Sequence, residues 1–69
     1  MEITIKVVFE IIGMEAYYII TVVSEDTLKA IKTHKRKAMY YRSAFDVGEK
    51  IAKNYEEKGY FINDIQEFR

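Results

Sequence analysis

The chain has 69 residues, of which 49% are hydrophobic, 14% aromatic and 32% charged, and its eleven basic residues balance eleven acidic ones. This composition is typical of a folded domain and excludes a disordered tail, which would be poor in aromatic and β-branched residues. Cysteine and proline are absent, so disulfides, thiolate metal sites and polyproline ligands are excluded. We expect one small domain over residues 1–69, in the cytoplasm, because no apolar run resembles a signal peptide or is long enough to span a membrane.

The first two segments of the chain predict a β-hairpin. Apolar and polar residues alternate with a period of two from Glu2 to Ile12, which is typical of a strand with one face on a core. A run rich in β-branched and aromatic residues follows from Ala16 to Val23. Gly13 lies between the two runs and adopts a positive φ at no steric cost, so we expect it at the tip of the hairpin.

The next segment predicts a first helix. Ser24 is interpreted as its N-cap, since Glu25 and Asp26 follow it where the helix dipole favours acids. Residues 34–42 leave three alternatives open, namely an extension of this helix, a loop, or a short strand at 39–42. The preferred interpretation is a helix that frays into a basic connection.

A second helix is expected over residues 44–58. Ser43 and Asp46 match the capping box, in which a hydroxyl and an acid satisfy free backbone donors at a helix start. Gly59 is placed to end the helix. The residues between them carry an apolar stripe with helical spacing, formed by Ala44, Val47, Gly48, Ile51 and Tyr55.

Residues 60–68 predict a final strand in which the alternation changes phase. Asn63 and Asp64 are interpreted as a β-bulge, and a capped turn that begins at Asn63 is the alternative. This strand can pair antiparallel with the second strand or parallel with the first. The expected fold is an α+β two-layer sandwich of order ββααβ, with both helices on one face of a small sheet.

The chain holds few of the groups that active sites need. His34 is the only histidine, and it lies among cations that disfavour its protonated form. Ser24 and Ser43 are explained as helix caps, and the phosphate-loop, dinucleotide and zinc-protease motifs are absent. We therefore expect no enzyme activity, no cofactor and no metal site.

The neutral net charge conceals an uneven distribution. Six of the eleven basic residues and no acid lie between Thr27 and Phe45, so zero is the sum of +6 in this stretch and −6 elsewhere. Basic side chains contact phosphates and exposed aromatic rings stack on unpaired bases, so the first hypothesis is a DNA- or RNA-binding module that uses residues 29–42. The alternative is a solvated helix face with the tyrosines packed on the core. The candidate binding residues are Lys32, Lys35, Arg36, Lys37, Tyr40, Tyr41 and Arg42.

The hairpin carries apolar residues on both of its faces. If the odd-numbered residues of the first strand face the helices, part of the apolar surface remains on the opposite face. The second hypothesis is therefore a protein partner or a homodimer that binds this outer face, and an unpaired sheet edge offers another route. The alternative is that these are ordinary half-exposed residues of a very small domain. The candidate interface residues are Val8, Ile12, Tyr17 and Ile19.

Overall fold

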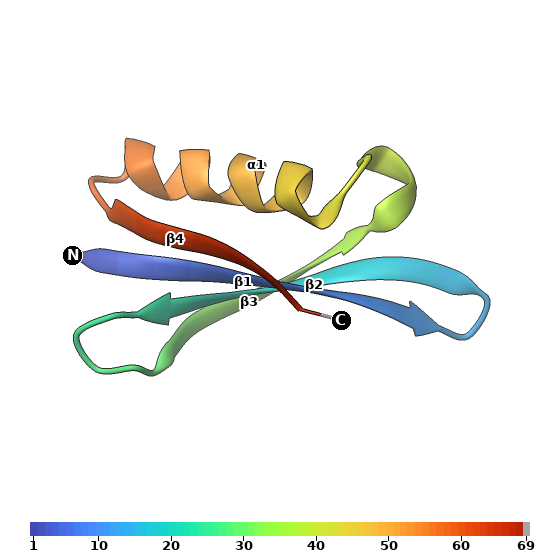
Figure 1. Cartoon of the computed structure of the whole chain (residues 1–69), viewed down its shortest axis with the longest axis horizontal. Helices are drawn as coiled ribbons and strands as arrows, with labels where there is room; N and C mark the ends of the chain where they lie inside the picture. Colours follow the sequence, from blue (N-terminus) through green and yellow to red (C-terminus); the bar gives the residue numbers. More distant parts are fainter. Residues whose placement is uncertain (69) are drawn as a thin grey trace.

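The computed structural model describes residues 1–68, in which one four-stranded sheet carries a single α-helix on one face (Figure 1). The strands lie in the order β3-β2-β1-β4; β2 pairs antiparallel with both β1 and β3, and β4 pairs parallel with β1. The fold is thus a two-layer α+β arrangement of order βββαβ. The elements are β1 (Glu2–Ile12), β2 (Glu15–Ser24), β3 (Ala30–Lys37), a 3₁₀ turn η1 (Ala38–Tyr40), α1 (Ala44–Glu57) and β4 (Phe61–Phe68).

The predicted hairpin is confirmed as β1 and β2. Its two strands pair without interruption from Ile3 opposite Ser24 to Ile12 opposite Glu15. Gly13 has a φ of 67° at the tip, which is the left-handed conformation that favours glycine. The two-residue alternation of β1 places its odd-numbered residues on the side of the helix, as the sequence predicts.

The predicted first helix is wrong, and with it the order ββααβ. Residues 30–37 form the strand β3, while 38–40 form η1 in place of the frayed helix or the short strand at 39–42. Ser24 does cap a turn, because its Oγ accepts from the Thr27 amide at 3.4 Å and its carbonyl accepts from the Leu28 amide at 2.8 Å. Leu28 then adopts a φ of 58°, and this left-handed conformation stops the turn from continuing as a helix.

The position of β3 at the edge of the sheet explains why sequence pattern does not reveal it. Its residues alternate between the two faces, but cations occupy both, so the strand lacks the alternation of apolar and polar residues that marks a half-buried strand. Lysine is common on edge strands because its charge blocks pairing with another sheet. Ladder pairing with the buried strand β2, for example Ile20 opposite His34, overrides the local preference for helix.

The predicted second helix is confirmed as α1. Ser43 Oγ accepts from the Asp46 amide at 3.2 Å, so the capping residue is the one that the sequence indicates. Gly59 follows the last helical turn with a φ of 95°, and the Tyr60 amide donates back to the Tyr55 carbonyl at 3.0 Å. Among residues 1–68, no helix is long and apolar enough to cross a membrane.

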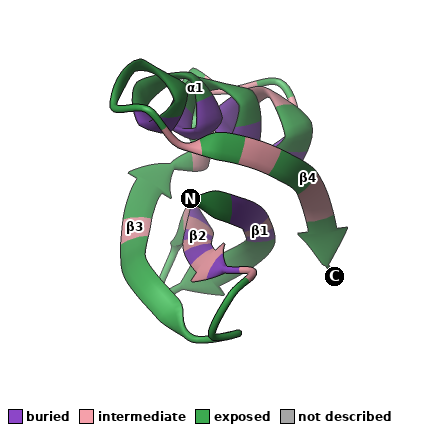
Figure 2. Ribbon diagram, turned by 90° about the vertical axis from the view of Figure 1, so that its left-hand side faces the viewer, coloured by how far each residue is buried: buried purple, intermediate pink, exposed green. Residues whose placement is uncertain are grey.

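The core lies between α1 and the two central strands (Figure 2). At its closest approach α1 carries Gly48, where an added Cβ would lie 2.6 Å from Ile65 Cγ2 and 3.2 Å from Val7 Cγ2. The glycine therefore lets the helix backbone lie directly on β1 and β4. The buried apolar residues are Ile3, Ile5 and Val7 of β1, Tyr18, Ile20 and Val22 of β2, and Ala44, Val47, Ile51, Ala52 and Tyr55 of α1.

The predicted bulge in the last strand is confirmed, and β4 takes the parallel position beside β1. Ile62 lies opposite Ile3, but Asp64 lies opposite Thr4, so Asn63 is the extra residue. The bulge brings the Asn63 amide to the face opposite α1, where it donates to Glu25 Oε1 at 2.9 Å. The phase change in the sequence is therefore a real feature of the strand.

Candidate interaction surfaces

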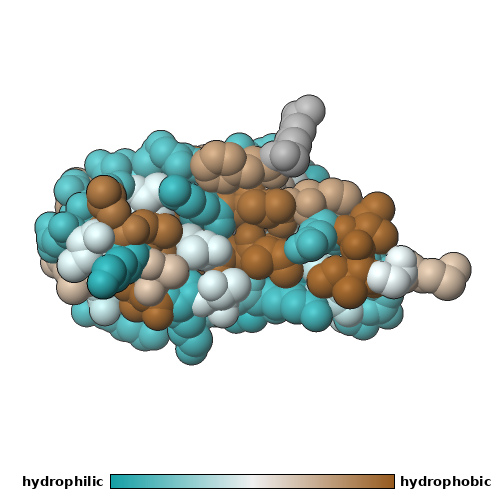
Figure 3. All heavy atoms as spheres, turned by 90° about the horizontal axis from the view of Figure 1, so that it is seen from below, coloured by the Kyte–Doolittle hydropathy of each residue, from teal (hydrophilic) through white to brown (hydrophobic). Residues whose placement is uncertain are grey.

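In residues 1–68 the one α-helix lies on one side of the sheet (Figure 1), and we call the opposite side the outer face (Figure 3). It carries the even-numbered residues of β1 and the odd-numbered residues of β2 that pair with them. Apolar residues form a group in the middle of this face, and further apolar groups lie towards both of its ends. We define the outer patch as Val8, Ile12, Tyr17, Ile19, Val23 and Phe68, all of which are half-buried or exposed.

All four predicted interface residues lie in the outer patch, which also contains two residues that are not among the predicted ones. Val23 follows the parity of Tyr17 and Ile19, so the sequence alone carries a signal for it. Phe68 joins the patch because β4 pairs Phe68 with Val8, and that pairing follows only from the parallel position of β4. Val8 is 37% exposed, at the centre of the patch.

Polar side chains cover the outer face at the end of the sheet that lies away from the β1–β2 turn. Thr4, which is 3% exposed, donates from its hydroxyl to Glu25, and Asn63 donates to both Thr4 and Glu25. These three side chains join β1, the β2–β3 turn and the bulge of β4. The outer-patch residues Val8, Ile12 and Ile19 lie on the hairpin side of these polar contacts.

Two rows of paired residues cross the outer patch from β3 towards β4. The first row runs Lys35, Ile19, Val8 and Phe68, and the second runs Lys37, Tyr17 and Glu10. Each row therefore begins with a cation on β3. The first row ends with an aromatic ring and the second with a carboxylate.

The cations of the rows already contact groups on the same face. Lys35 Nζ lies 4.5 Å from the centroid of the Tyr17 ring, and Lys37 Nζ lies 3.6 Å from Glu15 Oε1. Tyr17 donates its hydroxyl proton to Glu15, and this hydrogen bond, with Lys37 beside it, lowers the pKa of the Glu15 carboxyl. The same hydrogen bond raises the pKa of Tyr17.

The predicted nucleic-acid residues on β3 are divided between the two faces of the sheet. Lys35 and Lys37 point to the outer face, while Lys32 and Arg36 lie on the face of α1. The four cations are therefore neighbours along one exposed edge without forming a single flat basic surface. Because this segment is a strand, the alternative of a solvated helix face is wrong.

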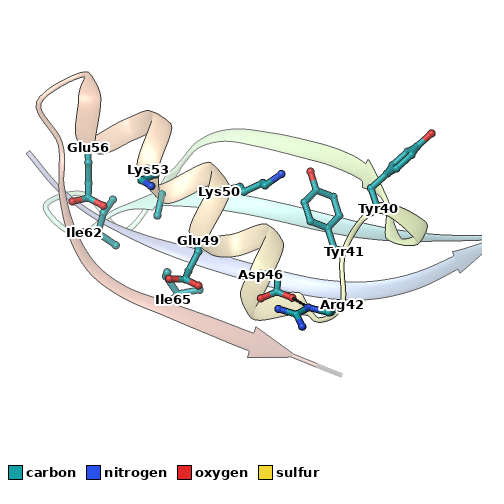
Figure 4. A pocket seen from close by; sticks show the side chains of 11 residues that line it. Tyr40, Tyr41, Arg42, Asp46, Glu49, Lys50, Lys53, Glu56, Ile62 and Ile65 are labelled. Atoms are coloured by element: carbon teal, nitrogen blue, oxygen red, sulfur yellow. Dashed lines mark ion pairs between the residues drawn. The ribbon is translucent and has the colours of Figure 1, made fainter.

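The remaining predicted nucleic-acid residues lie beyond β3, where the chain enters α1 (Figure 4). Tyr40 is 73% exposed, whereas the Tyr41 ring packs edge-on against Tyr18 with centroids 6.4 Å apart. Arg42 forms an ion pair of 3.9 Å with Asp46. An open groove of about 520 Å³ adjoins these residues, and its lining from α1 carries both acids and lysines. The structure thus places Tyr40 in solvent and uses Tyr41 for packing.

His34 lies on the helix side of β3 and connects this strand to α1. Its Nε2 is 3.0 Å from the Tyr55 hydroxyl, and the two rings meet edge to face. Burial lowers the pKa of His34, and the nearby cations Arg36, Lys32 and Lys58 lower it further. The side chain is therefore a neutral packing residue at pH 7.

A second apolar surface lies on the helix side of the hairpin, beyond the start of α1. An open groove of about 430 Å³ is lined by Phe9, Tyr18 and Met39 together with neighbouring residues of β2, β3 and η1. Ile11, on the same side, is 67% exposed. We call this the tip groove; sequence reasoning missed it because it depends on where α1 begins relative to the hairpin.

Comparisons with known proteins provide no relative for this chain. It matches no protein-family model, no curated protein and no solved structure. The function is therefore argued from the surfaces described above.

Proposed function

We propose that this chain is a non-enzymatic protein-interaction module of the cytoplasm that binds its partner through the outer patch. The observation that supports the proposal most strongly is the uncovered apolar centre of the outer face. An antiparallel sheet that is packed on one side usually presents polar residues on the other. Here that position holds Val8, Ile19 and their neighbours in place of polar side chains.

The arrangement of the outer patch resembles that of a protein interface. Protein interfaces have an apolar centre, a polar rim and a high content of tyrosine and phenylalanine. The centre here is apolar, and Tyr17 and Phe68 supply two aromatic rings. Lys6, whose Nζ is 5.8 Å from the centroid of the Phe68 ring, and Lys35 border the patch with charge.

Paired lysine substitutions on β1 test this proposal. We expect Val8→Lys to abolish capture of partners from a lysate of the source organism, because it places a charge at the centre of the patch. Ile11→Lys is the matched control, since Ile11 is an exposed apolar residue of the same strand on the opposite face. Equal capture by both variants and the unmodified chain, with folding verified by circular dichroism, would reject the outer patch as the binding surface.

A second candidate function is nucleic-acid binding along the β3 edge. One observation favours it: Lys32, Lys35, Arg36 and Lys37 follow one another along an exposed edge strand, and Tyr40 is free to stack on a base. A single strand that follows this edge would contact roughly four phosphates, so the logarithm of its affinity should fall with the logarithm of salt with a slope of about −3.

Salt titration of a fluorescent single-stranded oligonucleotide tests this second candidate. Lys35→Ala and Arg36→Ala should each weaken binding and make the salt slope shallower, because each removes one phosphate contact. Lys53→Ala, an exposed lysine of α1, is the control. Binding that is absent at low salt, or that all three substitutions weaken equally, would exclude the β3 edge as the site.

A further inference from the structure

We infer that the occupant of the outer patch is a second copy of this chain, packed face to face about a twofold axis that runs parallel to the strands. This inference rests on the proposed function and names the partner of the same surface. Two features of the outer face support it: the order of chemical groups along its two rows, and the size of the face.

The symmetry of such a dimer determines which residues meet. Consider a twofold axis that lies between the two sheets, parallel to the strands and midway between β1 and β2. This axis keeps each row at the same position along the strands but reverses its direction, so that β1 faces the partner's β2 and β3 faces the partner's β4. Each row therefore faces a reversed copy of itself, as in any isologous interface. In the first row, Val8 faces the partner's Ile19 and Ile19 faces the partner's Val8, so the apolar centres of the two sheets pack together about 10 Å apart.

The same reversal brings the two ends of the first row together and places the two charged residues of the second row one strand apart. In the first row, Lys35 reaches the partner's Phe68, and a cation over an aromatic ring is attractive. In the second row, Glu10 lies opposite the partner's Tyr17, and Lys37 lies one strand further out, where its long side chain reaches the partner's Glu10 carboxylate. Lys35 and Lys37 therefore each lie within reach of a complementary group of the partner, twice per dimer.

Two other arrangements of a pair of chains bring like charges together. A twofold axis across the strands places β3 over the partner's β3, where Lys35 and Lys37 face cations. Extension of the sheet by pairing two β3 edges also aligns cation-rich strands, since β3 carries four basic residues in eight. Of these three arrangements, the charge pattern favours the axis parallel to the strands.

The size of the outer face predicts a weak dimer. Four strands at about 4.8 Å spacing and eight residues at about 3.4 Å each give a face of roughly 500 Å², or about 1,000 Å² for two copies. Specific interfaces bury about 1,000 Å² or more in total, so this dimer lies at the lower limit. One face is on the order of a tenth of the 4905 Å² surface of the chain. We expect the chain to be dimeric at protein concentrations of hundreds of micromolar and monomeric at a few micromolar.

Sedimentation equilibrium from about 5 μM to 1 mM tests the dimer. The unmodified chain and Ile11→Lys should associate with similar constants, and Val8→Lys should weaken association at least tenfold. A monomeric unmodified chain at 1 mM would overturn the inference. If Val8→Lys then still abolished capture of another protein, the proposed function would stand with a different partner; if it did not, both would fall.

A charge exchange tests the predicted axis. Glu10→Lys and Lys37→Glu each place like charges across the dimer, so each variant alone should dimerise at least fivefold more weakly than the unmodified chain. In a mixture of the two, residue 10 of either chain meets an opposite charge at residue 37 of the other, and mixed dimers should form preferentially. We would follow a fluorescently labelled Glu10→Lys chain by sedimentation velocity while adding Lys37→Glu. Mixed dimers no stronger than either variant alone would contradict this axis.

Discussion

The two faces of the sheet differ although their residues are alike. Ile19 and Ile20 are neighbours in β2, and Val7 and Val8 are neighbours in β1, yet Ile20 and Val7 are fully buried while Ile19 and Val8 contact solvent. The helix makes the difference, because α1 covers one face and leaves the other open. Apolar character alone therefore does not distinguish residues that stabilise the monomer from residues that are available for a partner.

This comparison assigns different roles to the two faces. Burial of apolar side chains under α1 supplies most of the folding free energy, at about 25 cal/mol per Å² removed from water. The apolar side chains of the outer face gain comparable burial only when a partner covers them. Substitutions on the inner face, which is the face that α1 covers, should thus change the stability of the monomer. Substitutions on the outer face should mainly change association.

The largest expected effect compares Ile20→Ala with Ile19→Ala. Ile20 is fully buried under α1, so its truncation should cost about 3 kcal/mol, and Ile19, which is half-buried, should cost about 1 kcal/mol or less at low protein concentration. Urea unfolding followed by circular dichroism measures both. Since a domain of this size has only about 3–5 kcal/mol to lose, Ile20→Val and Ile19→Val provide a milder pair. Equal losses at the two positions would refute the division between faces.

Gly48→Ala sharpens the comparison at the contact between α1 and the inner face. An added Cβ would lie 2.6 Å from Ile65 Cγ2, and this overlap should outweigh the gain in helix propensity of about 1 kcal/mol. We expect a net loss of about 1–2 kcal/mol in the free energy of unfolding. Asn54→Ala, at an exposed position of α1, serves as the control. A stabilised Gly48→Ala variant would show that the helix does not lie as close to the sheet as described.

Ser43→Ala tests how much the N-cap of α1 contributes to the stability of the fold. The substitution leaves the Asp46 amide without its acceptor and should cost about 1 kcal/mol. Ser43→Asp restores an acceptor and adds a negative charge where the helix dipole favours it, so its stability should stay close to that of the original chain. Thermal unfolding measures both variants. An equal loss for both would indicate that the side chain at this position acts through something other than the cap.

The smallest expected effect concerns the contact of His34 with α1 and its dependence on pH. Burial lowers the pKa of His34 below its usual value of 6.5, so the folded chain binds a proton less readily than the unfolded chain. Stability should therefore be complete above pH 6.5 and should decline as the pH falls from 6.5 through the lowered pKa. We would compare urea unfolding at pH 7.5 and 5.5 for the original chain and His34→Gln. The decline should be smaller in the variant; identical declines would contradict this role of His34.

The sequence is sufficient to predict the elements whose residues repeat with a clear period. The alternation of β1, Gly13 at the tip, Ser43 at the helix start and the phase change at Asn63 all reflect local geometry, and each prediction is confirmed. Five of the six residues of the outer patch follow from the alternation of β1 and β2. Local pattern is therefore informative wherever one side of an element is buried and the other is not.

The sequence is insufficient where pairing with a distant strand decides the structure. The sequence predicts a helix over part of β3 because Ser24, followed by Glu25 and Asp26, has the pattern of a helix N-cap. Only the ladder with β2 makes this segment a strand. Phe68 enters the outer patch only through its pairing with Val8. The division of Lys32, Lys35, Arg36 and Lys37 between two faces follows from the same missed strand.

Methyl NMR with a soluble paramagnetic probe tests most directly whether the outer face is both open and used. At about 20 μM the probe should broaden the methyl signals of Val8 and Ile19 and spare those of Val7 and Ile20, which are buried. At about 1 mM, Val8 and Ile19 should become protected while Ile11, beside the tip groove, should stay broadened. Protection of Ile11 with no change at Val8 and Ile19 would show that the chain associates through the tip groove and that the outer patch is not its interface.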